Sequence, residues 1–256
     1  MNIRPLLALA CAAVCLPLTR GLAADRPAIP ADSIAHKKEL LFSDDFESAT
    51  PKSQWHRVVD TFVFEHGTLK GTQTRDMNIP AQDGKPAVQA HAAVYGLSIP
   101  TKDSVVEVKM RLDGARMMDV EFDDRAYTGS HYGHLCRAQV YLDHVTIMDE
   151  RDGSQNEELN KLRMDPDPAK REEANRIRAA HQINFPLADK LEPGKWYTVV
   201  VETVGEAMRV TIDGKPVAFF KSAGIGHPTK SKIELGVAGK DGYFDDIKVW
   251  NAEPAK

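Results

Sequence analysis

The residues best suited to chemistry lie in two neighbouring stretches near the middle of the chain, residues 119–125 and 130–137. Successive side chains of a strand point to opposite faces, so Asp119, Glu121 and Asp123 share one face at spacings of about 7 Å. Three carboxylates on one face repel one another unless a cation, an arginine or shared protons intervene. Such a cluster is typical of sites with shifted pKa values.

Alternating carboxylates on a concave sheet suit glycosidic bond cleavage. That reaction uses two carboxyl groups roughly 5 to 10 Å apart, one as acid and one as nucleophile or base. We therefore predict Glu121 and Asp123 as catalytic residues, with Asp119 and Asp124 contacting the substrate. The alternative is a solvent-facing strand side without a catalytic role.

The second stretch carries His131, His134 and Arg137, with Tyr127 and Tyr132 close by. A neutral histidine is a general base near neutral pH, and an arginine stabilises a developing oxyanion. We predict His131, His134 and Arg137 as catalytic and the two tyrosines as substrate-binding. This set also suits enolisation beside a sugar ketone. The competing interpretation is loop histidines with structural hydrogen bonds.

Two metal sites are compatible with the sequence. A zinc site from His131, His134 and Asp124 is a weak alternative, because a spacing of three suits a helical turn rather than a strand. Carboxylates near the two ends of the domain suit calcium. Its predicted ligands are Asp44, Asp45, Asp245 and Asp246. We expect no other cofactor, and strand-end acids stabilised by turns and water are the alternative to calcium.

Two further loops carry polar groups suited to substrate binding. Glu150 and Arg151 follow a predicted strand, and His227 and Lys230 lie in a loop rich in glycine and proline. Loops on a rigid scaffold commonly carry binding residues, although ordinary turn roles are the simpler explanation for all four. Cys136 lies among apolar neighbours and is predicted to be a buried thiol.

The N-terminus has the pattern of a secretory signal. Arg4 precedes an apolar run over residues 6–18, and small residues follow at 21–24. We expect residues 1–24 to be removed and the protein to be secreted or periplasmic, with no membrane span. The formal charge of −4 and the absence of a basic cluster argue against a nucleic-acid partner. The oligomeric state is left open.

The remaining sequence predicts an all-β protein. Short segments alternate apolar and polar residues, as in 61–64, 104–112 and 196–202, and turn residues separate them. Asp213-Gly214 joins two such segments and favours a tight hairpin turn. After a leader over residues 25–38, we predict a two-sheet antiparallel jelly-roll sandwich over 39–252. A charged segment at about 152–186 is predicted as a helical insertion, acting as a solvated cover or as a lid.

Strand and turn motifs at both ends of this domain resemble those of a known superfamily. They are Phe42-Ser-Asp-Asp-Phe-Glu47, Trp55, Gly67-Thr-Leu69, Pro193-Gly-Lys-Trp196, Ile212-Asp-Gly-Lys-Pro-Val217 and Phe244-Asp-Asp-Ile-Lys-Val-Trp250. The chain resembles a concanavalin A-like, or laminin G-like, jelly roll, and within it the bacterial 3-keto-disaccharide hydrolase domain family.

That resemblance implies an exported carbohydrate-active domain, a hydrolase or lyase acting on glycosides or 3-keto-glycosides. Family-sixteen glycoside hydrolases share the jelly roll and use a Glu-x-Asp-x-Glu strand, which appears reversed here as Asp119-x-Glu121-x-Asp123. The alternative function is a non-catalytic module that binds a glycan or cell wall through the same face. In both cases the expected partner is a carbohydrate.

Overall fold

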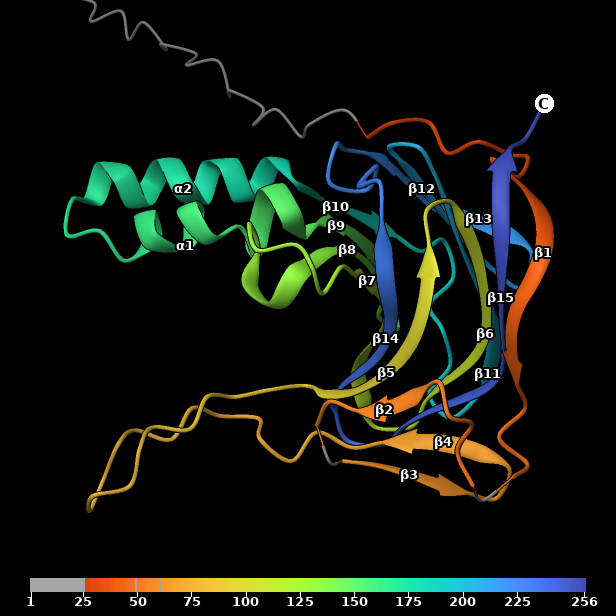
Figure 1. The fold of residues 1–256 in the computed structure, drawn as a ribbon, viewed down its shortest axis with the longest axis horizontal. Helices are drawn as coiled ribbons and strands as arrows, with labels where there is room; N and C mark the ends of the chain where they lie inside the picture. The colour runs from red at the N-terminus through yellow and green to blue at the C-terminus, as the bar shows by residue number, and fades with distance from the viewer. Residues whose placement is uncertain (1–25, 49, 60) are drawn as a thin grey trace, which may run out of the picture.

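The computed structural model describes residues 26–48, 50–59 and 61–256, so the expected signal over residues 1–24 lies outside the described residues. Two antiparallel β-sheets stack face to face (Figure 1). Sheet A has the order β13 (Lys215–Lys221), β12 (Ala207–Ile212), β11 (Trp196–Val204), β6 (Ser104–Leu112), β15 (Gly242–Pro254), β4 (Thr68–Gly71) and β3 (Phe62–Glu65), with β1 (Ala35–Asp44) also paired to β15. Sheet B has the order β10 (Gln182–Pro186), β9 (His144–Asp149), β8 (His134–Val140), β7 (Ala115–Asp123), β14 (Lys230–Gly239), β5 (Ala93–Thr101) and β2 (Trp55–Arg57).

This architecture confirms the predicted two-sheet antiparallel sandwich. The strand pattern begins earlier than expected, because residues 35–37, assigned to the leader, already pair with the end of β15. The first and last strands therefore lie side by side in sheet A. Among the described residues, no helix is long and apolar enough to cross a membrane.

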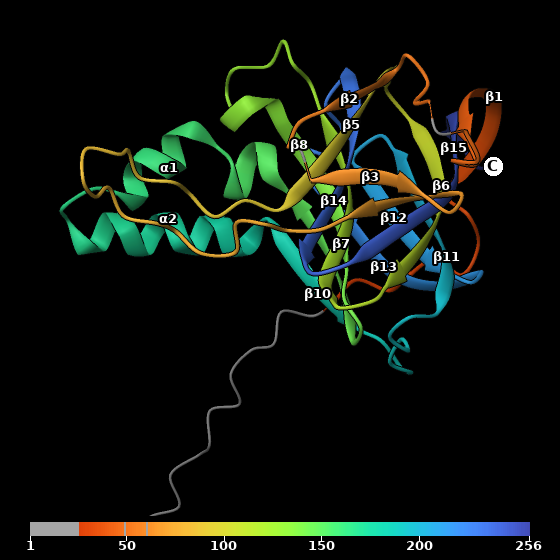
Figure 2. The same ribbon diagram turned by 90° about the horizontal axis from the view of Figure 1, so that it is seen from below.

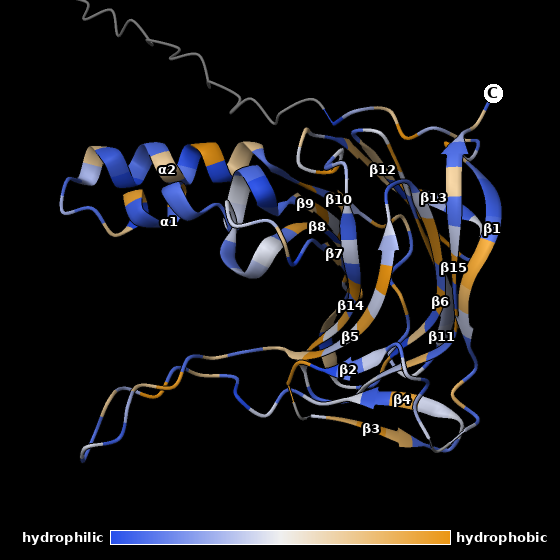
Figure 3. Cartoon of the chain, in the orientation of Figure 1, coloured by the Kyte–Doolittle hydropathy of each residue, from blue (hydrophilic) through white to orange (hydrophobic). Residues whose placement is uncertain are grey.

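The core lies between the two sheets and is built by period-two alternation. In β6, Val106, Val108 and Met110 are buried while the residues between them are partly exposed. In β7, Val120 and Phe122 face the core from the other sheet. Burying a large apolar side chain contributes roughly 1.5–3 kcal/mol to the stability of the fold. The apolar side of each strand is therefore held in the core, and the other side is available for a functional site. Figure 3 shows apolar colour along the strands and polar colour on the helices.

The hairpin between β12 and β13 matches its prediction. Asp213 has φ 48° and Gly214 has φ 76°, so both central residues of the turn are left-handed. That geometry is the one that suits the right-handed twist of paired strands, and aspartate and glycine tolerate it.

The charged insertion forms two helices, α1 (Glu157–Arg163) and α2 (Pro168–Ala180), after a π-helical turn, η2 (Glu150–Ser154). The Asn156 side chain accepts hydrogen bonds from the first turn of α1, and Asp167 caps α2 ahead of a proline at its start. The insertion is shorter than predicted, since residues 182–186 form the edge strand β10.

The two helices and the long loop between β4 and β5 project on the same side of the sandwich, beyond sheet B (Figures 1 and 2). That loop, residues 72–92, is held together by isolated bridges such as Arg75 to His91. Both projections flank the face of sheet B that points away from the core.

Candidate functional site

The outward face of sheet B carries a row of polar residues that strand register places side by side. Arg137 on β8 stands opposite Glu121 on β7, and Glu121 stands opposite Glu234 on β14. The row continues through Gly96 on β5 to His56 on β2. A Cβ at Gly96 would approach the His56 ring to 2.2 Å, so the histidine lies directly over the glycine.

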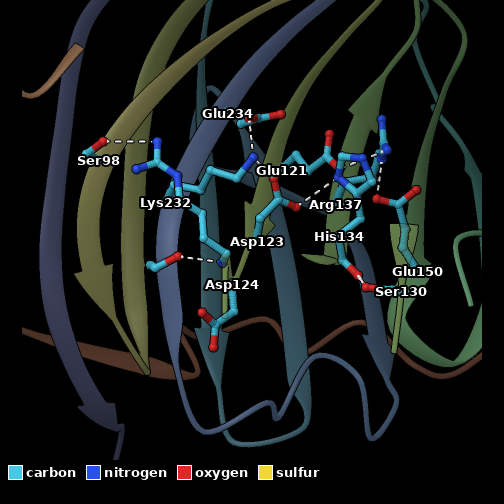
Figure 4. Close-up of polar contacts among 12 residues, drawn as sticks. Ser98, Glu121, Asp123, Asp124, Ser130, His134, Arg137, Glu150, Lys232 and Glu234 are labelled. Carbon is cyan, nitrogen blue, oxygen red and sulfur yellow. Dashed lines mark hydrogen bonds and ion pairs between the residues drawn. The ribbon is translucent and has the colours of Figure 1, made fainter. Parts of the chain in front are cut away.

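A second row runs beside the first, one pleat along the strands. His134 pairs with Asp123, Asp123 with Lys232, and Lys232 with Ser98. Directly opposite side chains have Cβ atoms about 5 Å apart, so the two rows form one continuous polar grid. Figure 4 shows these side chains converging above the sheet.

Arg137 is the central cation of the grid. Its guanidinium group contacts Asp119 Oδ2 at 3.2 Å, Glu121 Oε1 at 2.9 Å and Glu150 Oε2 at 2.7 Å. All three carboxylates are at most 3% exposed. Burial lowers the pKa of Arg137, but the three carboxylates outweigh it and hold that pKa well above its usual value. Arg137 is therefore permanently charged.

The carboxyl groups around Arg137 differ in protonation. Burial raises the pKa of Glu121 well above its usual value, and the charges of Asp123 and Glu150 add to the rise, while Arg137 only partly opposes it. Burial also raises the pKa of Glu150, but Arg137 overcomes this and leaves the pKa below its usual value. The pKa of Glu121 is thus raised and that of Glu150 lowered, so Glu121 takes up a proton more readily than Glu150.

His134 lies between two carboxylates. Its Nδ1 contacts Glu121 Oε1 closely and lies 3.1 Å from Asp123 Oδ1. Burial lowers the pKa of His134, but Glu121 and Asp123 together raise it to about 11. His134 is therefore an imidazolium at neutral pH. This corrects the predicted role of His134 as a general base, since the protonated ring has no lone pair to accept a proton.

Lys232 and Glu234 complete the floor of the site from β14. Lys232 Nζ lies 3.0 Å from Asp123 Oδ2 and 2.6 Å from Glu234 Oε1. Burial raises the pKa of Glu234, and Asp123 adds to the rise, while Lys232 opposes it. The pKa of Glu234 therefore stays above its usual value, and the Lys232 ammonium group limits the rise.

Four of these groups could also hold a metal ion. Ligand atoms of Glu121, Asp123, His134 and Glu234 all lie within 4.8 Å of one another. Carboxylate oxygens and an imidazole nitrogen suit several divalent ions, calcium being bound mainly by the oxygens. The ammonium group of Lys232 lies beside Asp123 and Glu234, so the protein itself already supplies a positive charge at this position.

The grid forms the floor of an open cleft of about 1060 Å³ on sheet B. Floor residues that line it are Glu121, His134, Arg137, Lys232 and Glu234, and the walls include Arg75, His91, Arg125, Tyr127, His131, Tyr132 and Glu157. The Tyr132 side chain is 79% exposed, so its ring is free to stack on a ligand. The dimensions suit a few sugar units.

Several predicted site residues lie close to this cleft. His131, His134, Arg137, Tyr127 and Tyr132 line it together with Glu121. Asp119, Asp123 and Glu150 do not line it but support the floor residues through Arg137, His134 and Lys232.

Three other predicted substrate-binding residues do not line the cleft and make contacts within the protein. Asp124 accepts hydrogen bonds from Thr229 Oγ1 and from the Ala126 amide, which fastens the loop after β7. His227 packs its ring 4.9 Å from that of Tyr127, behind the cleft wall, and Arg151 pairs with the neighbouring Asp152.

The prediction that Lys230 binds substrate is wrong. A register shift between Lys230 and Lys232 breaks the alternation of β14, and the Lys230 side chain is 1% exposed. Its Nζ donates to the carbonyl of Lys102 at 2.6 Å, and burial lowers its pKa. Lys230 therefore does not reach a substrate. The predicted buried thiol of Cys136 is confirmed, because that side chain is fully buried in the core.

The predicted metal ligands do not come together within the described ranges. Asp44 accepts from Trp55 Nε1 at 2.7 Å and from the Phe46 amide, and Asp246 pairs with Lys109. Asp45 and Asp245 accept hydrogen bonds from nearby backbone amides instead. The possible zinc ligands do not form one group either. His134 belongs to the four potential ligands on the floor of the cleft, but Asp124 does not. The candidate metal position is the floor of the cleft.

The sequence interpretation missed Glu234, Lys232, Arg125, His56 and Ser98. Lys232 and Glu234 alternate with apolar residues in β14, which signals a half-buried strand with charges on one face. The sequence could not show that this face adjoins Glu121, because strand register joins residues more than one hundred positions apart.

The comparisons with known proteins define the fold. No protein-family model and no curated protein matches this chain. Among solved structures it is similar to the laminarinase from Rhodothermus marinus, with a TM-score of 0.55 and 12% identity over 86% of this chain and 99% of that one. It is similar to the endo-β-1,3-glucanase from Pyrococcus furiosus, with a TM-score of 0.55 and 9% identity over 88% and 100% of the two chains.

A carbohydrate-binding module is similar as well. The carbohydrate-binding module CBM66 from Bacillus subtilis aligns with a TM-score of 0.50 and 12% identity, covering 77% of this chain and 96% of that one. At these identities the similarity establishes the concanavalin A-like jelly roll. It leaves the chemistry to the residues of the cleft.

Proposed function

We propose that this protein is a carbohydrate-active enzyme that cleaves a glycosidic bond in the cleft on sheet B. The observation that carries the proposal is the pair formed by Glu121 and Glu234, two cleft-lining carboxyl groups with oxygens within 4.8 Å. Separations of about 5 Å are those of retaining glycosidases, whereas inverting enzymes need roughly 6.5–9.5 Å. The similar glucanase folds support the same interpretation.

The pair divides the roles by protonation. Burial and the charges of Asp123 and Glu150 raise the pKa of Glu121, which favours its role as the proton donor to the leaving oxygen. Glu234, next to the Lys232 ammonium, attacks the anomeric carbon as a carboxylate. Glu121, now ionised, then takes a proton from the water that releases the glycosyl group. His134 and Arg137 stabilise the charge that appears on Glu121.

Asp123 is not assigned a direct role in this mechanism. It is fully buried and bound by both His134 and Lys232, so it acts by positioning those two cations. The catalytic pair proposed from the structure is thus Glu121 with Glu234, in place of Glu121 with Asp123.

A panel of oligosaccharides, both ordinary and oxidised to the 3-keto form, tests the substrate. Product formation is followed by mass spectrometry, and the anomer first released is identified by NMR. We expect cleavage with retention, lost in Glu121→Gln and in Glu234→Gln. Cleavage of the 3-keto sugars alone would favour the lyase or hydrolase chemistry implied by the sequence resemblance. Absence of product from every sugar would contradict the enzyme proposal.

A non-catalytic glycan-binding module is the second candidate. One observation favours it: the carboxylates of the floor are all paired with Arg137, His134 or Lys232, which suits a rigid binding surface. The similarity to CBM66 agrees with this alternative. It predicts sugar binding without product, so calorimetry run beside the cleavage assay distinguishes the two.

Export is part of the proposal. The apolar run and small residues of the N-terminus indicate a cleaved signal. Expression of the full chain followed by fractionation and N-terminal sequencing checks this. A mature protein starting near residue 25 outside the cytoplasm is expected, and an uncleaved cytoplasmic chain would contradict it.

A further inference from the structure

We propose that the cleft selects saccharides that carry an anionic group, a carboxylate or a sulfate ester, and that Arg125 and Arg75 bind that group. The inference deepens the proposed function and rests on the cleft being the saccharide site. It concerns the cleft wall beside β5 and β2, apart from the carboxyl pair on the floor.

Arg125 has no acidic partner. Its Nη2 lies 2.7 Å from His56 Nε2 and 3.3 Å from Ser98 Oγ, and no carboxylate of the described residues forms an ion pair with it. Its backbone amide donates to Ser231 Oγ at 2.8 Å, which fixes the base of the side chain. The guanidinium group is therefore held in place by neutral groups while its charge remains uncompensated.

The pKa of His56 responds to the positive charge at this wall. Burial lowers the pKa of His56, and the charges of Arg125 and Lys232 lower it further. The imidazole is thus neutral at physiological pH, so it accepts a hydrogen bond from Arg125 and adds no second cation. An arginine oriented in this way presents its remaining N–H groups to the cleft.

The other cations of the cleft behave differently. Arg137 and Lys232 are each bound to buried carboxylates, so their charge is balanced within the protein. Arg75 lines the same cleft from the 72–92 loop, and no ion pair is formed by its side chain with any described residue. The acidic wall residue Glu157 lies 3.8 Å from His131 Nδ1. Two arginines therefore remain available to a ligand.

The chemistry of guanidinium groups identifies the ligand class. A planar fork of N–H donors matches the two oxygens of a carboxylate or a sulfate, and such bonds are stronger than those to neutral hydroxyls. Water and salt screen charges inside a cleft less than charges on an open surface. An anion therefore gains more binding energy here than at an open surface. A neutral glycan would leave both arginines unpaired.

The test compares three probes of similar length: tetragalacturonate, a sulfated carrageenan tetrasaccharide and cellotetraose. Binding to the full mature protein is measured by calorimetry at low and high salt. We expect at least one anionic probe to bind about tenfold or more tightly than cellotetraose, with affinity falling as salt rises. The probe that binds shows whether the anion is a carboxylate or a sulfate.

Variants connect the preference to the arginine. Arg125→Gln is expected to reduce the preference about tenfold, and Arg125→Lys to restore part of it. Arg116→Gln, at an exposed position of β7 that does not line the cleft, should leave the preference unchanged. Thermal denaturation confirms that each variant folds. Equal or better binding of cellotetraose, or no binding of either anion, overturns the inference.

The two proposals fail separately. Cleavage of neutral sugars by a protein that ignores anionic ones would overturn the inference and leave the proposed function standing. Binding of an anionic probe that depends on Arg125, without any product, would overturn the enzymatic function and leave the inference standing.

Discussion

Glu121 on β7 and Glu234 on β14 stand directly opposite each other in the antiparallel register of sheet B, with carboxylate oxygens within 4.8 Å. Like charges in opposite positions destabilise a sheet. The raised pKa of Glu121 and the Lys232 ammonium group beside Glu234 relieve that repulsion. The same arrangement gives an acid and a carboxylate at one end of a cleft, and the predictions below follow from it.

Glu121→Gln is expected to lower kcat for glycoside cleavage by about a thousandfold, within the range typical of a lost general acid. The fold should survive, because an amide of the same shape replaces the carboxyl group and its oxygen still accepts from Arg137. Activity and melting temperature are measured together. Glu107→Gln, on the other sheet and paired with Lys37, serves as the control. Full activity of Glu121→Gln would contradict the assignment.

Arg137→Met is expected to destabilise the fold by about 3–5 kcal/mol, since it leaves three buried carboxyl groups without their shared cation. Urea denaturation at neutral pH measures this loss. The matched change Arg116→Met, at an exposed position of β7, should have no measurable effect. A loss no larger than that of the control would mean that the acids simply take up protons.

The stability of the fold should fall as pH rises from about 6.5 to about 11 because of His134. Its pKa is raised to about 11 from 6.5, so its contribution is complete below pH 6.5 and disappears as pH approaches the folded value. The raised pKa values of Glu121 and Glu234 act in the same direction from lower pH upward.

Chemical denaturation across this pH range tests the effect, with His134→Gln as the comparison. The variant should show a smaller decline between pH 7 and pH 10 than the original chain. Parallel stability curves for the two proteins would show that His134 is not the titrating group.

Lys232→Gln is expected to create a binding site for a divalent cation. The ammonium group lies against Asp123 and Glu234, so its removal leaves a set of carboxylates that a metal ion would neutralise. Calcium should raise the melting temperature of the variant more than that of the original chain, and a chelator should reverse it. An equal change in melting temperature for the two proteins would show that Lys232 does not compete with a metal ion.

Tyr132→Ala should weaken saccharide binding by about three- to tenfold with little change in stability, because an exposed ring contributes to stacking and not to the core. Calorimetry with the best ligand checks the loss. Tyr141→Ala is the control, since that ring stacks on His144 outside the cleft. An unchanged dissociation constant would remove Tyr132 from the binding surface.

The fold was largely predictable because its signals are local. Period-two alternation in segments such as 104–112 defines which face is buried, and Asp213-Gly214 fits a hairpin turn by its own backbone preferences. The charged segment was recognised as helical, but its last five residues joined the sheet as β10 because pairing with β9 overrides local composition.

The sequence alone determined that Asp119, Glu121 and Asp123 share one face of a strand, because side-chain alternation depends only on neighbouring residues. Only the tertiary structure decided that Glu234 faces Glu121, since pairing between β7 and β14 is set by packing of the whole core. The same packing turned Lys230 away from the cleft through a register shift and gave His134 two carboxylate partners that fix its charge. Whether a segment forms a strand, and which of its side chains share a face, depends on neighbouring residues in the sequence. Strand register and the pKa values of the site depend on residues that folding brings together from distant parts of the chain.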